Sequence, residues 1–120
     1  GEIRSVAGTP MDFRRPRVMR KEAGLDYDHC WVLDRSAAAN DLVLAARLSD
    51  PRSGRVLEIS TNQPGIQFYN GSFLDGSVPG RGGRSYGPLA GLCLEPQNFP
   101  DAPNHPNFPS CRLRCNGRVS

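Results

Sequence analysis

Glycine and proline interrupt this chain so often that long helices are not expected in it. The 120 residues contain 13 glycines and 11 prolines. Proline breaks the interior of a helix, and sheets confine both residue types to turns, bulges and edges. The sequence therefore predicts short strands joined by many turns, with a thin core, in one modest domain.

The clearest local pattern is that of a β-hairpin. Residues 42–48 form an apolar run, in which two alanines leave a helix open as an alternative. Residues 49–54 (SDPRSG) have turn chemistry, because proline presets φ and glycine tolerates positive φ. Residues 55–61 then alternate, with Leu57 and Ile59 facing the same way. An antiparallel hairpin fits both halves better than a helix does.

Three shorter segments are also strand candidates. Residues 30–33 and 66–69 combine aromatic and β-branched side chains, and residues 91–95 form an apolar strand that Pro96 is expected to close. Five or six short strands would leave apolar faces and unpaired edges open to water. The sequence therefore predicts an all-β fold that is part of a larger sandwich, or that self-associates or binds a partner through uncovered sheet edges.

Charge and cysteine usage exclude several classes of function. The net charge is +3, and the only dense basic group, residues 14–21, is short and lacks a base-stacking motif, so we expect no nucleic-acid partner. The longest apolar stretch is too short to span a membrane. Cysteines 30, 93, 111 and 115 lack the spacing of a zinc site, and no secretory signal segment is visible. Free thiols in the cytoplasm, with no metal or other cofactor, are therefore the expectation.

Two carboxylates stand where a sheet commonly carries chemistry. Asp28 directly precedes a predicted strand, and Glu95 ends another beside a long loop. General acid–base catalysis needs two titratable groups on opposite sides of the reacting bond. However, most carboxylates at strand ends are simply solvated or cap a loop, so the pattern alone makes both residues candidates and nothing more.

The remaining polar residues favour structural interpretations. Gln67 and Tyr69 alternate with apolar neighbours, which is the pattern of a polar sheet face. His29 is more typical of a hydrogen-bonded structural group than of a catalyst. His105 stands in a proline-rich stretch and is expected on an exposed loop.

Five segments, in the same order along the chain, resemble motifs of the aldose 1-epimerase family. They are residues 8–16 (GTPMDFRRP), 27–33 (YDHCWVL), 53–58 (SGRVLE), 61–69 (TNQPGIQFY) and 91–102 (GLCLEPQNFPDA).

The resemblance implies a fold, a reaction and a set of site residues. The fold is the antiparallel β-sandwich of the galactose mutarotases, and residues 1–120 would be the C-terminal portion of a single domain of that kind. The reaction interconverts the α and β anomers of aldohexoses such as galactose or glucose, and it needs no cofactor. By its motif Glu95 takes the place of the family's catalytic base. Asp28 and Gln67 take the places of residues that hydrogen-bond sugar hydroxyls.

The chain also departs from the family's pattern. The family's general acid is a histidine, and a second histidine helps to bind the sugar, but both belong upstream of these motifs and neither His29 nor His105 matches them. Pro96 stands where the family usually has threonine. We therefore expect epimerase activity only where a longer chain or a partner supplies the missing region. The alternatives are a non-catalytic sugar-binding or regulatory remnant and, supported only by the basic group, a relative acting on hexose phosphates.

Overall fold

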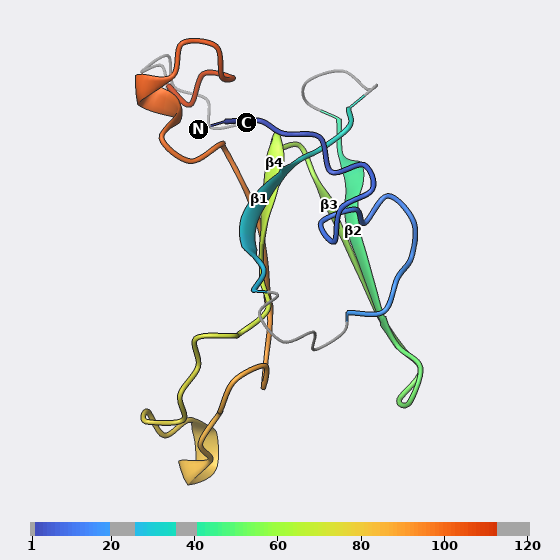
Figure 1. The fold of residues 1–120 in the computed structure, drawn as a ribbon, viewed down its shortest axis with the longest axis vertical. Coiled ribbons are helices and arrows are strands. Elements are labelled where there is room, and N and C mark those ends of the chain that lie inside the picture. Colours follow the sequence, from blue (N-terminus) through green and yellow to red (C-terminus); the bar gives the residue numbers. More distant parts are fainter. Residues whose placement is uncertain (1, 20–25, 36–40, 113–120) are drawn as a thin grey trace.

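In the part of the chain that the structure describes, five antiparallel strands form two sheets, which lie side by side in Figure 1. The computed structural model describes residues 2–19, 26–35 and 41–112. The strands are β1 (Asp28–Val32), β2 (Val43–Asp50), β3 (Arg55–Thr61), β4 (Gly65–Tyr69) and β5 (Cys93–Gln97). The only helical elements of the described residues are two 3₁₀ turns, η1 (Arg81–Gly83) and η2 (Ala102–Asn104). The all-β prediction is confirmed.

The predicted hairpin is formed by β2 and β3, and the helical alternative for residues 42–48 is wrong. Leu48 pairs with Leu57 and Asp50 pairs with Arg55 across the ladder. At the tip the Gly54 N–H donates to the Asp50 carbonyl at 2.8 Å, and Gly54 has φ of 71°. The glycine is needed here because a side chain disfavours positive φ.

The second sheet has the strand order β1-β4-β5, with β4 in the centre. The two outer strands flank β4 antiparallel to it, and residues 66 and 68 of β4 are buried on one face. β5 continues through Pro96 to Gln97, so the expectation that Pro96 closes this strand is wrong. Among the described residues β5 pairs with a strand on one side only, so a proline is tolerated where its nitrogen faces away from β4.

An aromatic cluster forms the core beside the buried face of this sheet. Phe13, Tyr27, Trp31 and Phe68 have ring centroids between 5.2 and 6.3 Å apart. The Trp31 Nε1–H donates to the carbonyl of Met11 at 2.9 Å. The N-terminal segment (dark blue in Figure 1) is thereby tied to the face of the sheet opposite to the one that carries Gln67.

The core is thin, as the composition predicted. Leu44 and Val56, on the outer face of the hairpin, keep 58% and 52% of their surface exposed. Within the described ranges no further strand pairs with the outer edges of β1 and β5. Association through these edges stays a prediction.

Candidate active site

The three residues that the family motifs single out lie on one face of the three-stranded sheet. Gln67 on β4 stands directly opposite Glu95 on β5 and opposite Cys30 on β1. Asp28 lies two residues before Cys30 on the same strand. Because directly paired residues share a face and alternate residues of a strand point the same way, Asp28, Gln67 and Glu95 project from the same side. This surface is called the polar face below.

A hydrogen bond joins two of the three side chains. The Gln67 Nε2 amide donates to Asp28 Oδ1 at 2.8 Å, which orients the amide across the β1–β4 ladder. Glu95 is the direct cross-strand neighbour of Gln67, and such neighbours have Cβ atoms roughly 4.5–5.5 Å apart. Asp28 and Glu95 are exposed and Gln67 is half-buried. The polar face thus presents two carboxylates and an oriented amide to solvent.

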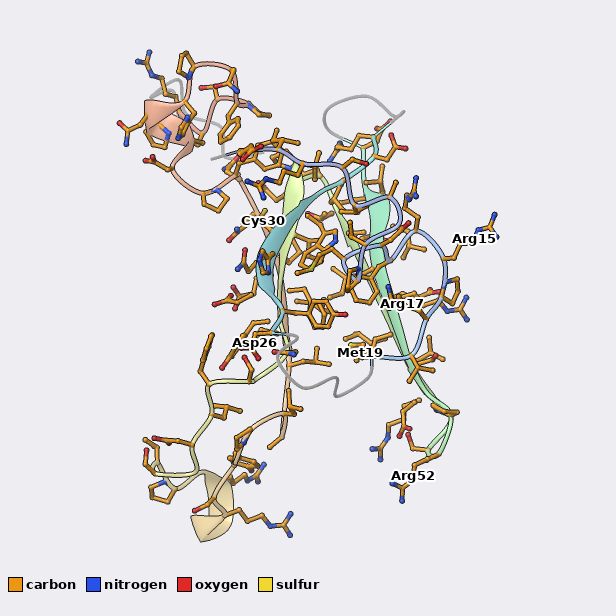
Figure 2. All side chains as sticks on the ribbon, viewed as in Figure 1. Arg15, Arg17, Met19, Asp26, Cys30 and Arg52 are labelled. Carbon is orange, nitrogen blue, oxygen red and sulfur yellow. The ribbon has the colours of Figure 1, made fainter. Side chains whose placement is uncertain are left out.

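One end of the polar face is covered by the loop that follows β5. A Cβ atom on Gly65 would lie 2.9 Å from Cys30 Sγ and 3.0 Å from a ring carbon of Phe99, so any larger residue would have to displace these two side chains. The Phe99 ring also contacts Phe108 edge-on, with centroids 5.3 Å apart. Cys30 (labelled in Figure 2) is half-buried here, and burial raises the pKa of its thiol. The cysteine is therefore part of the packing at this end.

Sequence analysis missed this covered end. Gly65 was interpreted only as part of a family motif, and residues 98–112 were assigned to a motif and an exposed loop, with no packing role against the sheet. The available signal was a glycine opening an alternating strand, which often marks the close approach of another group. Nothing local in the sequence, however, shows that Phe99 is the group that approaches.

Neither histidine lies with Asp28, Gln67 and Glu95 on the polar face. His29 is the strand neighbour of Asp28 and therefore points to the opposite face, where its ring lies 6.1 Å from that of Trp31. His105 follows η2, where its Nε2 lies 3.3 Å from Asp101 Oδ2 and its ring packs against Phe108. His29 Nδ1 accepts a hydrogen bond from the Asp28 N–H at 3.2 Å, which agrees with a hydrogen-bonded structural group. His105 lies on a loop as expected, but it is half-buried there because its ring packs against Phe108.

An open surface hollow lies on the N-terminal segment, away from the polar face. It is lined by the N-terminal residues Thr9, Asp12, Arg14, Arg15, Pro16 and Arg17. Arg14 pairs with Asp12 and holds the pKa of that carboxyl below its usual range, and the Arg17 guanidinium donates to the Pro10 carbonyl at 3.1 Å. Figure 2 shows Arg15 and Arg17 on this segment. Two of the three arginines are thus engaged in contacts within this loop, so the hollow is explained by the structure of the loop. The chemistry of the polar face is the better guide to function.

Some residues considered in the sequence analysis lie outside the described residues. They are Arg20 and Lys21 of the basic group and Cys115 near the C-terminus. Within residues 2–19, 26–35 and 41–112, no three His, Cys, Asp or Glu side chains are grouped to hold a metal ion. Over the same residues no helix has the length and apolar character needed to cross a membrane.

The fold and the polar face together define an all-β protein of antiparallel sheets with a carboxylate–amide site on one sheet face. Comparison with known proteins gives the family. Residues 1–119 match the family model described as aldose 1-epimerase. The chain belongs to the aldose 1-epimerase family, and the resemblance seen in its motifs is confirmed.

Individual relatives agree with this assignment. The chain is 42% identical over 120 residues to the galactose mutarotase of Homo sapiens, and 45% identical over 118 residues to that of Sus scrofa. It is 37% identical over 122 residues to the aldose 1-epimerase of Escherichia coli (strain K12). These alignments cover 93–95% of the chain but 34% of each relative. The chain therefore spans about a third of the length of the curated relatives that it matches.

Proposed function

We propose that this chain forms the base-bearing side of an aldose 1-epimerase site, as the C-terminal portion of one domain. In this proposal Glu95 is the catalytic base, and Asp28 and Gln67 bind the sugar. One observation carries it: the three side chains stand on three strands far apart in the chain, yet they share one sheet face. The relatives named galactose mutarotase and aldose 1-epimerase support an aldohexose as the substrate.

The reaction needs a base and an acid on either side of the anomeric centre. Glu95, as a carboxylate, takes the proton from the O1 hydroxyl, and the electron pair left on O1 forms the carbonyl while the bond from C1 to the ring oxygen breaks. The acid gives its proton to the ring oxygen. Rotation about the C1–C2 bond and closure on the other carbonyl face reverse both proton transfers and yield the other anomer. A glutamate is normally ionised at neutral pH and so accepts the first proton.

In this proposal the acid comes from beyond these residues. His29 points to the opposite face, and His105 is engaged with Asp101 and Phe108. The family's acid is a histidine that precedes the motifs present here, so we infer that a preceding region supplies it. A longer chain or a partner would bring that region. Losing one acid or base typically lowers the rate about 10²- to 10⁴-fold.

A second candidate function is sugar binding without catalysis. It is favoured by the contact between Gln67 and Asp28, which forms without any contribution from Glu95. The two residues could hold sugar hydroxyls even where no acid faces Glu95. This candidate predicts saturable binding of galactose and no change in the rate of mutarotation.

Polarimetry of freshly dissolved α-D-galactose separates the two candidates. The full chain, its Glu95→Gln variant and buffer are compared, with Glu58→Gln as the matched control. Glu58 is an exposed glutamate on β3 that pairs with Arg47 at 3.5 Å, away from the polar face. Because the proposed acid lies elsewhere, the chain alone should match the spontaneous rate. A chain and a Glu58 variant that exceed this rate, with a Glu95 variant that does not, would instead place an acid within these residues and keep Glu95 as the base.

The same assay with the preceding region added in trans tests whether an acid is what is missing. A rate that rises only when that region and Glu95 are both present supports the proposed division of roles. Equal rates for Glu95→Gln and Glu58→Gln in the supplemented assay would refute Glu95 as the base.

A further inference from the structure

An aromatic pair stands at the open end of the polar face. Tyr69 projects from the same side as Gln67 and is the direct partner of Asp28 in the β1–β4 ladder. The ring of Phe73, from the loop after β4, stacks on the Tyr69 ring with centroids 5.9 Å apart and planes at 14°. The backbone N–H of Phe73 donates to the Tyr69 hydroxyl at 2.9 Å. Tyr69 therefore fixes Phe73 through both its ring and its hydroxyl.

The backbone at Gly71 directs the chain back toward Tyr69. Gly71 has φ of 75°, and a Cβ atom there would overlap the carbonyl oxygen of Gly91. The Leu89 N–H donates to the Gly71 carbonyl at 2.9 Å and closes the base of the loop. The loop (yellow in Figure 1) thus leaves the sheet at the end where Asp28 and Tyr69 pair. Phe73 is held by a constrained turn and does not sit on a free tail.

Phe73 nevertheless remains 67% exposed. A single exposed apolar side chain is common and does not by itself indicate a binding role. Here the exposed ring is ordered by two contacts and adjoins a face that carries two carboxylates and an amide. Val78, which is 76% exposed in the same loop, has no such setting. A fixed apolar surface beside a few placed polar groups is the usual composition of a small-molecule site.

We propose that Phe73 is a sugar-stacking residue, with Tyr69 as the residue that positions it. This inference rests on the proposed function of the polar face. A hexose has hydroxyls around its rim and C–H bonds on its ring faces. Asp28 and Gln67 take hydroxyls, while the negative face of the Phe73 ring takes the partly positive C–H hydrogens. The ligand class is therefore an aldohexose bound with one C–H face against the aromatic ring.

The test is the dissociation constant of D-galactose for the full chain, measured by NMR titration. Phe73→Leu removes the ring but keeps apolar volume, and Phe73→Tyr keeps the ring. Val78→Ala is the control from the same loop. We expect Phe73→Leu to raise the dissociation constant roughly 3- to 10-fold, the range of one aromatic stacking contact. Phe73→Tyr and Val78→Ala should bind as the unmodified chain does.

A second readout identifies the contact itself. Saturation transfer from the aromatic protons to the C–H protons of bound galactose should fall in Phe73→Leu and persist in Phe73→Tyr. Unchanged affinity and transfer in Phe73→Leu, with weaker binding in Asp28→Asn, would overturn the stacking role and leave the proposed function standing. If galactose does not bind the unmodified chain, both are overturned.

Discussion

Replacing Gly71 with alanine tests the turn that carries the chain out of β4. Gly71 adopts left-handed backbone geometry with φ of 75°, and its missing side chain leaves room for the carbonyl oxygen of Gly91. An alanine must therefore both tolerate the backbone conformation and displace the neighbouring backbone. The second requirement is the more demanding one, because a backbone carbonyl cannot move aside as a flexible side chain can.

The size of the effect follows from these two terms. Left-handed geometry costs an L-residue roughly 1–2 kcal/mol. Displacing Gly91 opens the base of the loop and removes the 2.9 Å hydrogen bond from the Leu89 N–H to the Gly71 carbonyl, worth about 1 kcal/mol. We expect Gly71→Ala to destabilise the base of the loop by about 2–3 kcal/mol.

Gly82→Ala is the matched control. Gly82 lies in the same loop with φ of 68°, but a Cβ atom there would have nothing within 4 Å. It should incur only the backbone term of roughly 1–2 kcal/mol. The difference between the two variants isolates the overlap with Gly91.

Hydrogen exchange of the Leu89 amide is the appropriate assay, because a loop opens locally without unfolding the sheet. Exchange of this amide should be faster in Gly71→Ala than in Gly82→Ala by about fivefold or more, which corresponds to about 1 kcal/mol. Equal Leu89 exchange in the two variants would refute the reasoning, because the overlap would then cost nothing.

Two further predictions concern the core and the covered end of the polar face. Trp31→Phe removes the donor to the Met11 carbonyl, so the free energy of unfolding should fall by about 1–2 kcal/mol. A urea titration followed by circular dichroism measures this change. An unchanged free energy of unfolding would mean that this hydrogen bond does not anchor the N-terminal segment. Burial disfavours the Cys30 thiolate and raises the pKa of the thiol. Iodoacetamide should therefore alkylate Cys30 more slowly than the exposed Cys93 at pH 8, and the alkylation of Cys30 should become faster as the pH rises. Equal alkylation rates of the two cysteines, measured by mass spectrometry, would contradict this.

The β2–β3 hairpin was predictable because its determinants are local. Apolar alternation sets the two faces of β3, and the turn residues around Gly54 fix where the chain reverses. Each of these signals acts within a few residues. Their agreement with one another favoured the hairpin over a helix for residues 42–48, and the structure shows a strand there.

The polar face was not predictable from local pattern. Alternation places Gln67 on one side of β4, but it does not say which strands flank β4 or in what register. The β2–β3 hairpin comes between β1 and β4 in sequence, and a long loop comes between β4 and β5. Only the family motifs joined Asp28, Gln67 and Glu95 before the sheet was seen. Their sharing of one face depends on long-range pairing, and no single segment encodes it.

Pro96 shows how a local rule fails at a sheet edge. Proline is a strand breaker where its nitrogen must donate to a neighbouring strand, which led to the expectation that β5 ends before it. In the sheet order β1-β4-β5 the outer side of β5 has no strand among the described residues, so the missing donor disturbs nothing. Whether a strand is central or at an edge is a property of the whole sheet.

The most direct test of the polar face as a sugar site is an NMR map of D-galactose binding to the full chain. The account predicts that added galactose shifts the Gln67 side-chain amide and the backbone amides of Asp28 and Glu95, and leaves those of Arg15 and Glu58 unchanged. Shifts confined to the N-terminal hollow around Arg15, with the Gln67 amide unmoved, would contradict it.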